Sequence, residues 1–158
     1  MLIEEEIVFL LKEKGFHLVT AESCTGGKLI STIINVSGAS SVVDEAYVTY
    51  ANKAKERLLG VKEQTIKRFG VVSEEVASEM VIGATKRAMA EVGISTTGIA
   101  GPLGATAKTP VGMVCFGFKI CDKVITITKE FGNIGRDNVR DEAVLFALNY
   151  LKKILKEM

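Results

Sequence analysis

Apolar residues recur at helical spacing in several stretches of the chain. Residues 2–14 place their larger apolar side chains on one helical face: Ile3, Ile7, Leu10 and Leu11. Gly15 follows where a left-handed residue ends a helix. Comparable spacing predicts further helices at residues 28–36, 52–59, 63–69, 73–91 and 135–157. Asn52 and Ser73 are the predicted N-caps of two of them, and the inner face of the 73–91 helix is Val76, Met80, Ala84 and Ala88.

Shorter segments rich in β-branched and aromatic residues predict the strands. They are residues 17–20, 41–50, 94–97, 111–120 and 123–131, the last two forming a hairpin. Helices around mixed strands indicate an α/β fold with three layers, α/β/α, and a mixed, mostly parallel sheet. Because no repeat, low-complexity segment or linker interrupts the pattern, residues 1–158 are expected to form a single domain.

The balance of charges indicates a small ligand rather than a polymer or a membrane. Lys and Arg number 20 against 19 Asp and Glu, so no field of one sign is expected to attract nucleic acid or an acidic membrane surface. The three cysteines have neither CxxC spacing nor a histidine cluster beside them, which suits reduced thiols. With an acidic rather than basic start and no apolar run of about 20 residues, the protein is expected to be soluble and cytoplasmic.

Ser23 is a candidate nucleophile because it lies in a glycine-rich turn between a predicted strand and a predicted helix. Such a turn can hold a hydroxyl clear of the backbone while the following amides bind an oxyanion or a phosphate. The alternative is that Ser23 or Thr25 simply caps the next helix, and the turn alone does not decide between them. Cys24 is the weaker candidate, since a thiol needs a partner to ionise and His17 is predicted at the far end of the strand.

With a single histidine in the chain, a serine nucleophile needs another base, and lysine is the known substitute. Lys55 is the candidate, because it follows a predicted strand and lies in the first turn of the next helix. Tyr50 ends that strand and is expected near the same crevice. A helix-surface lysine is usually solvated, however, and Lys53 is an alternative two residues away.

A second glycine turn, Thr97–Pro102, also follows a strand and presents amides and a hydroxyl, as an anion-binding turn would. Arg136 and Arg140 are four residues apart on one helical face, where they either hold a phosphate or pair with neighbouring carboxylates. The carboxylates show no metal-ligand spacing, and no Walker or GxGxxG fingerprint is present. Chemistry without a metal or cofactor is therefore expected.

Six blocks occur in one order along nearly the whole chain: Thr20–Gly27; Tyr50 with Asn52 and Ala54–Lys55; Gly70–Glu74; Thr97–Pro102; Pro110–Gly112; and Arg136 with Val139–Arg140. In this series the chain resembles the C-terminal domain of the competence-damage-inducible (CinA) family and its stand-alone PncC-type relatives, which are nicotinamide-nucleotide amidases. The resemblance implies an anticodon-binding-domain-like fold and a homo-oligomer. It also implies hydrolysis of the carboxamide of nicotinamide mononucleotide to nicotinic acid mononucleotide and ammonia, in pyridine nucleotide recycling.

In the family, the serine of the ESCTGG motif and the lysine of the YxNxAK motif are the catalytic pair, and the tyrosine assists. The resemblance therefore assigns catalysis to Ser23, Lys55 and Tyr50. Substrate contacts are expected from the surrounding motif residues: Thr25, Gly26, Gly27, Asn52, Thr97, Gly98, Gly101, Arg136 and Arg140.

The chain also departs from the family pattern. Leu103–Ala105 replaces the usual paired glycine after the glycine-proline turn, and Lys53 and Gly135 stand where acidic residues are common. The large N-terminal domain of longer members has no counterpart here, so none of its activities is transferred. Two alternatives to the amidase remain: a nucleotide-binding module without turnover, and a Ser-Lys hydrolase of another small amide.

Overall fold

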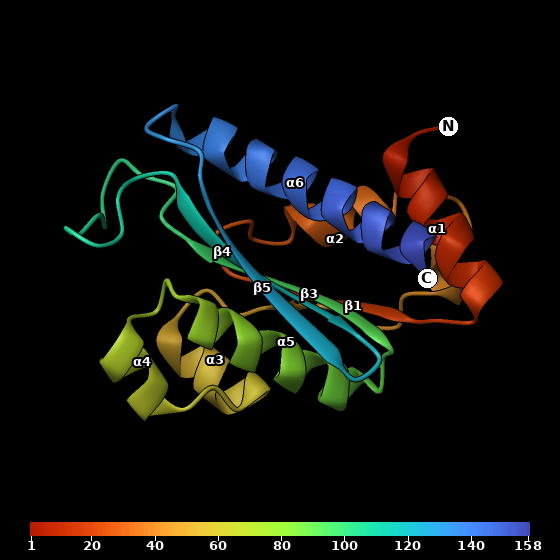
Figure 1. The fold of residues 1–158 in the computed structure, drawn as a ribbon, viewed down its shortest axis with the longest axis horizontal. Helices are drawn as coiled ribbons and strands as arrows, with labels where there is room; N and C mark the ends of the chain where they lie inside the picture. Colours follow the sequence, from red (N-terminus) through yellow and green to blue (C-terminus); the bar gives the residue numbers. More distant parts are fainter.

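The computed structural model describes residues 1–158 and places one five-stranded sheet between two layers of helices (Figure 1). The strands lie in the order β2-β1-β3-β4-β5. Their bounds are β1 Leu18–Glu22, β2 Tyr47–Val48, β3 Val92–Gly98, β4 Met113–Ile120 and β5 Lys123–Glu130. β1 is parallel to β2 and β3, whereas β4 is antiparallel to both of its neighbours. All strands except β4 thus run in one direction, which confirms the mixed, mostly parallel α/β sheet.

Three helices lie on each side of the sheet (Figure 1). The upper layer is α1 (Ile3–Lys14), α2 (Lys28–Ile33) and α6 (Arg136–Glu157). The lower layer is α3 (Asn52–Leu59), α4 (Glu63–Phe69) and α5 (Glu74–Ala88). The larger apolar core lies under α1, α2 and α6 and includes Phe116 and Phe118 of β4, and a smaller core joins α3 and α5 to β1.

The sequence analysis predicted every α-helix, and two of the predicted ends are confirmed in detail. Gly15 has φ 68° at the C-terminus of α1, and the Ser73 hydroxyl accepts the Val76 amide at 3.2 Å at the start of α5. The predicted inner face of α5 is buried throughout. Two helices end earlier than predicted: α2 ends at Ile33 instead of residue 36, and α5 ends at Ala88 instead of residue 91.

The strand predicted at residues 41–50 is wrong for most of its length. Only Tyr47 and Val48 pair with β1, and Ala39–Ser41 form a short 3₁₀ helix. Val42 is buried in the larger core, and its carbonyl accepts the Leu18 amide at 2.7 Å from a loop. The apolar residues of this segment therefore anchor a loop, and their β propensity is not expressed as pairing.

The predicted N-cap at Asn52 is also wrong. Ala51 is the N-cap residue of α3, and no side chain caps this end of the helix. Asn52 is the first helical residue and is exposed to solvent.

Gly83 of α5 sets how closely α3 approaches this helix. A Cβ atom at position 83 would lie 1.8 Å from the carbonyl oxygen of Leu59, so this packing requires glycine. Leu59 lies one helical turn after Lys55, and both side chains are buried on the same face of α3. The contact between α5 and α3 therefore fixes the helix that carries Lys55.

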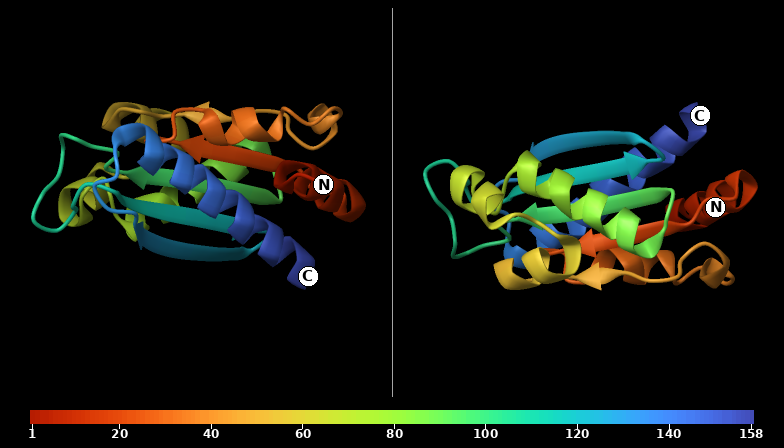
Figure 2. Two further views of the ribbon diagram at one scale, coloured as in Figure 1. Left: turned by 90° about the horizontal axis from the view of Figure 1, so that it is seen from above. Right: turned by 90° about the horizontal axis from the view of Figure 1, so that it is seen from below.

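The carboxyl ends of β1 and β3 lie side by side. Glu22 is in register with Thr96, and the Ser23 amide donates to the Thr96 carbonyl oxygen at 3.0 Å. The loop of residues 98–112 and the start of α6 lie at this same end of the molecule (Figure 2). Both glycine turns of the sequence thus meet at one edge of the sheet, as the topology predicts.

Candidate active site

Ser23 and Lys55 are in direct contact at the carboxyl edge of the sheet. The Lys55 ammonium donates to the Ser23 hydroxyl oxygen, with 3.0 Å between Nζ and Oγ. Two further contacts hold the amine, to the carbonyl oxygens of Thr49 at 2.7 Å and Tyr50 at 3.3 Å. Lys55 is 1% exposed and Ser23 is 9% exposed. The turn after β1 and the first turn of α3 therefore bring a hydroxyl and a shielded amine within hydrogen-bond distance.

The environment of Lys55 favours its neutral form. Burial lowers the pKa of the Lys55 side chain from 10.5 to about 8. The ion pairs of the structure do not include this residue, so no carboxylate stabilises its charged form. With such a pKa, about a tenth of the amine is neutral at pH 7 and about half at pH 8. Lys53, by contrast, has an 82% exposed side chain.

Cys24 and His17 do not form an alternative pair. Burial raises the pKa of the Cys24 thiol to about 12, so it stays protonated at neutral pH. His17 precedes the first residue of β1, and its ring contacts Asp44 at 2.8 Å. The two side chains are thus at opposite ends of the strand, and His17 cannot act as the base of the thiol.

Glu22 is a residue of the site to which the sequence analysis gave no role. Its carboxylate is fully buried and accepts five hydrogen bonds, from the amides of Gly27, Leu29 and Ile30 and from the hydroxyls of Thr20 and Thr25. Glu22 thus satisfies the N-terminal amides of α2 from the end of β1, a task usually given to an N-cap side chain. The amide of Gly27, the N-cap residue, is among these donors, and the residue has no side chain of its own to cap the helix.

Replacing Glu22 with glutamine is expected to lower the free energy of unfolding by about 2 kcal/mol, since one amide of α2 would then face an NH₂ group instead of an oxygen. Urea unfolding of both proteins at pH 7 measures this difference. Glu63→Gln, which removes one partner of an exposed pair with Lys67, is the matched control and should change stability by less than about 0.5 kcal/mol. An equal effect of both substitutions would contradict the proposed role of Glu22.

The turn after Ser23 contains two backbone amides without an acceptor. The Gly26 amide donates to the Ser23 carbonyl oxygen at 3.0 Å, and the Gly27 amide to Glu22. The amides of Cys24 and Thr25 make no hydrogen bond to another residue. An amide directly after a serine nucleophile is the usual donor to an oxyanion, which makes that of Cys24 the better placed of the two.

The two arginines at the start of α6 bind main-chain carbonyls of the glycine turns. Arg140 donates through Nε to Cys24 at 3.0 Å and through Nη2 to Thr25 at 3.1 Å. Arg136 donates to the Gly101 carbonyl and to the Tyr50 hydroxyl, both at 2.8 Å. Neither pairs with a carboxylate. Arg140 therefore braces the turn that follows Ser23, and Arg136 links the second glycine turn to Tyr50.

The remaining motif residues differ in their solvent exposure. Thr25 and Thr97 are buried, and their hydroxyls donate to Glu22 at 2.7 Å and to the Val71 carbonyl at 2.8 Å. Gly101 is also buried, Gly27 and Gly98 are half-buried, and the solvent-exposed residues are Gly26, Tyr50, Asn52 and Arg136. The structure thus gathers the motif residues at one edge, where only some of them have a free polar group.

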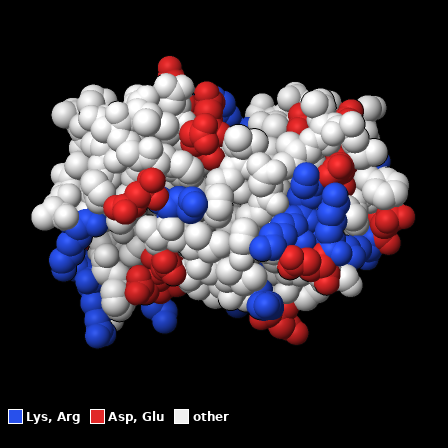
Figure 3. Space-filling model, turned by 45° about the horizontal axis from the view of Figure 1, so that its top comes forward, with Lys and Arg blue, Asp and Glu red and all other residues white.

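The surface around the fold carries no dominant charge. Acidic and basic side chains are interspersed on the face drawn in Figure 3, in agreement with a net charge of +1. No three His, Cys, Asp or Glu side chains come together in a group that could hold a metal ion. None of the helices combines the length and apolar character needed to span a bilayer.

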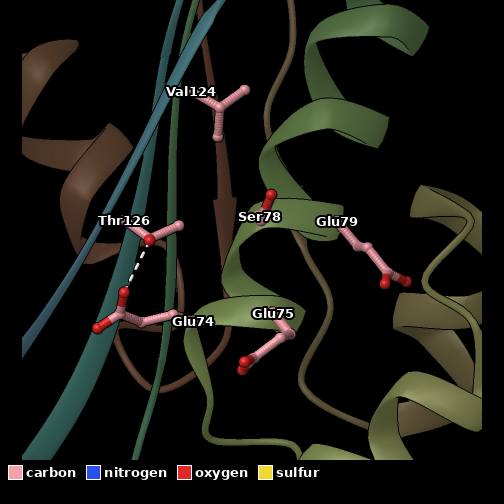
Figure 4. A pocket seen from close by; sticks show the side chains of 6 residues that line it. All are labelled: Glu74, Glu75, Ser78, Glu79, Val124 and Thr126. Carbon is pink, nitrogen blue, oxygen red and sulfur yellow. Dashed lines mark hydrogen bonds between the residues drawn. The ribbon is translucent and has the colours of Figure 1, made fainter.

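A hollow of about 490 Å³ between α5 and β5 is another concave part of the surface (Figure 4). Three of its six lining residues are glutamates, Glu74, Glu75 and Glu79. Thr126 donates to Glu74 at 2.7 Å within it. This hollow lies beside β5, an edge strand that β3 and β4 separate from β1. Its carboxylates would repel an anionic nucleotide.

The fold and the site define an α/β domain with a serine and a lysine in contact at the carboxyl edge of its sheet. The chain belongs to the CinA C-terminal domain family, whose model matches residues 2–155. It is 44% identical over 153 residues to a CinA-like protein of Kosmotoga olearia, covering 97% of this chain and 37% of that protein. It is 45% identical over 144 residues to the nicotinamide-nucleotide amidohydrolase PncC of Enterobacter agglomerans, covering 90% of this chain and 87% of that protein.

Solved structures of the family have the same fold. A competence/damage-inducible protein from Agrobacterium tumefaciens is 39% identical, with a TM-score of 0.92 over 98% of this chain and 95% of that one. A CinA superfamily protein from Klebsiella pneumoniae is 31% identical, with a TM-score of 0.94 over 99% and 97%. The chain spans little more than a third of the length of the CinA-like relative and nearly the whole of the PncC protein.

Proposed function

We propose that this chain hydrolyses the carboxamide of nicotinamide mononucleotide to nicotinic acid mononucleotide and ammonia, using Ser23 as nucleophile and Lys55 as base. The observation that carries the proposal is the 3.0 Å contact between the Lys55 amine and the Ser23 hydroxyl, made by an amine whose pKa burial lowers to about 8. The PncC relative, matched over 87% of its length, supports the choice of substrate.

The reaction begins with the neutral form of Lys55. Its amine accepts the Ser23 proton while Oγ attacks the carboxamide carbon, and negative charge develops on the carboxamide oxygen. The amide of Cys24, which donates to no other residue, is the proposed donor to this oxyanion. The Lys55 ammonium then protonates the departing nitrogen, and ammonia leaves behind an ester on Ser23.

Hydrolysis of the ester repeats the same steps with water. Neutral Lys55 takes a proton from the water, the oxygen attacks the ester carbon, and Ser23 regains its proton as the nicotinic acid product leaves. The carbonyls of Thr49 and Tyr50 hold the amine in place through both halves of the reaction. The exposed Tyr50 hydroxyl and Arg136 are available to contact the substrate at the entrance of the site.

An ammonia-release assay tests this proposal with nicotinamide mononucleotide, nicotinamide riboside and nicotinamide as parallel substrates. We expect the nucleotide to give the highest kcat/KM. Calorimetry that shows nucleotide binding without ammonia release would favour a binding module instead, and turnover of a different small amide would redirect the substrate assignment.

The value of kcat/KM is expected to rise with pH and to level off above an apparent pKa of about 8. The sign follows from the mechanism, because the base acts as the neutral amine and protonation below its pKa removes it. The second ionisation of the substrate phosphate has a pKa near 6, about two units lower, so it does not produce a rise centred at about pH 8. A pH–rate profile between pH 5.5 and 9.5, with stability checked at each pH, measures the effect, and a flat or falling profile would contradict a lysine base.

A further inference from the structure

A hollow of about 310 Å³ lies between the end of α4 and the loop of residues 98–112. We call it the α4 hollow. Its polar side chains are Arg68, Thr106, Lys108 and Thr109, and no carboxylate lines it. Neither Arg68 nor Lys108 takes part in an ion pair. The hollow therefore presents two cations whose charges nothing in the protein neutralises.

Two residues, Thr97 and Val71, lie between Ser23 and the α4 hollow. Ser23 directly follows Glu22, which is in register with Thr96, so Thr97 lies beside Ser23 on the neighbouring strand. Thr97 donates to the carbonyl of Val71, and Val71 lines the hollow. Ile99, two residues after Thr97, lines it as well. One step along the sheet and one hydrogen bond thus connect the nucleophile with the wall of the hollow.

Several other donors near Ser23 are bound to protein atoms, whereas the amides of Cys24 and Thr25 donate to no other residue. The N-terminal amides of α2 are satisfied by Glu22. Arg140 is bound to the carbonyls of Cys24 and Thr25, and Arg136 to Gly101 and Tyr50. Arg68 and Lys108 make neither an ion pair nor a side-chain hydrogen bond, so all of their donors are left for a ligand.

We infer that the α4 hollow binds the phosphate group of the substrate, so that the enzyme selects a 5′-phosphorylated nucleotide over its riboside. The inference rests on the proposed function. In a nicotinamide nucleotide the ribose separates the carboxamide-bearing ring from a dianionic phosphate, so the phosphate site is expected at a distance from Ser23 rather than in contact with it. Arginine and lysine together supply a planar donor fork and a point charge, a combination suited to phosphate.

The local structure around the two cations supports this assignment. The Arg68 guanidinium lies 5.2 Å from the centre of the Phe69 ring, a contact that restrains the side chain without using its N–H donors. Thr106 and Thr109 are 2.6 Å apart between their hydroxyl oxygens, and the Thr109 amide donates to Thr106 at 3.1 Å. The loop that carries Lys108 is thus closed on itself beside the hollow.

The test compares Arg68→Gln, Lys108→Gln and the double variant with the native protein. For nicotinamide mononucleotide, we expect KM to rise about tenfold in each single variant and more in the double variant, with kcat within about twofold of native. For nicotinamide riboside, which has no phosphate, kcat/KM should be unchanged. Lys67→Gln, on the same helix but outside the hollow, is the control and should behave as the native protein. An unchanged KM for the nucleotide in the double variant would overturn the inference.

A binding measurement separates this inference from the proposed function. Ribose 5-phosphate is titrated calorimetrically into the native protein and the double variant, with ribose as the probe that lacks phosphate. We expect ribose 5-phosphate to bind the native protein and to bind the double variant at least tenfold more weakly, whether or not ammonia is released from any amide. Equal binding to both proteins, or none to the native protein, would overturn the phosphate assignment while leaving the Ser23–Lys55 chemistry to be decided by the ammonia assay.

Discussion

Ser23→Ala is expected to reduce ammonia release from nicotinamide mononucleotide by at least about a thousandfold, because the substitution removes the atom that attacks the carboxamide carbon. The fold should persist, since the Ser23 hydroxyl has Lys55 as its hydrogen-bond partner and the lysine keeps its contacts with Thr49 and Tyr50. Single-turnover assays at pH 8, together with urea unfolding of the same preparation, measure both properties.

Cys24→Ala is the comparison that identifies the nucleophile. The Cys24 thiol is buried, and burial raises its pKa to about 12, so its loss should lower stability slightly and leave kcat within about tenfold of the native value. A protein that keeps its activity without the Ser23 hydroxyl and loses it without the Cys24 thiol would reverse the assignment of the two residues.

Lys55→Met is expected to lower kcat by about a thousandfold, the loss typical of removing a general base. It should also change how stability depends on pH. In the native protein the Lys55 pKa is lowered to about 8, so between pH 8 and 10.5 the unfolded chain binds more protons and stability rises with pH. The methionine variant should lack this rise, because its side chain does not titrate. Urea unfolding at pH 7, 8, 9 and 10 and ammonia release at pH 8 measure the two effects.

Lys53→Met is the matched control for the lysine experiment. Lys53 is on the same helix, its side chain is 82% exposed, and its nearest carboxylate, on Glu56, is 3.9 Å away. Its replacement should change neither activity nor the pH dependence of stability. A similar loss of activity in both variants would point to a general effect on α3 rather than to a base at position 55.

The sequence predicted those parts of the fold that depend on local periodicity. The sequence patterns identified every α-helix, and the Cys121–Asp122 turn between two apolar segments identified the β4–β5 hairpin. The segment of residues 41–50 was mispredicted because its Val and Tyr residues have β propensity, whereas strand pairing requires a neighbouring strand with free backbone groups. β1 offers a parallel partner only to Tyr47 and Val48, while Val42 is drawn into the core under α1, α2 and α6.

The candidate pair was predictable, but the contacts that support it were not. The lack of a second histidine and the motif series pointed to Ser23 and Lys55 as partners, which the structure places in contact across 32 residues of chain. The role of Glu22 depends on five donors from both sides of the turn, and that of Arg140 on carbonyls more than 100 residues earlier. No local pattern specifies such contacts, although a carboxylate at the end of an otherwise apolar strand is a signal that a buried polar task exists.

The missing side chain at Gly83 makes this position a remote determinant of the contact between Lys55 and Ser23. A methyl group there would collide with the backbone of Leu59 and push α3 outward. Leu59 is one helical turn after Lys55, so the shift would disturb the 3.0 Å contact between the Lys55 amine and Ser23. Any engineering of this domain that treats the outer helices as a replaceable scaffold would therefore have to keep position 83 as glycine. In this sense the proposed active site depends on a residue that acts only through backbone packing against α3.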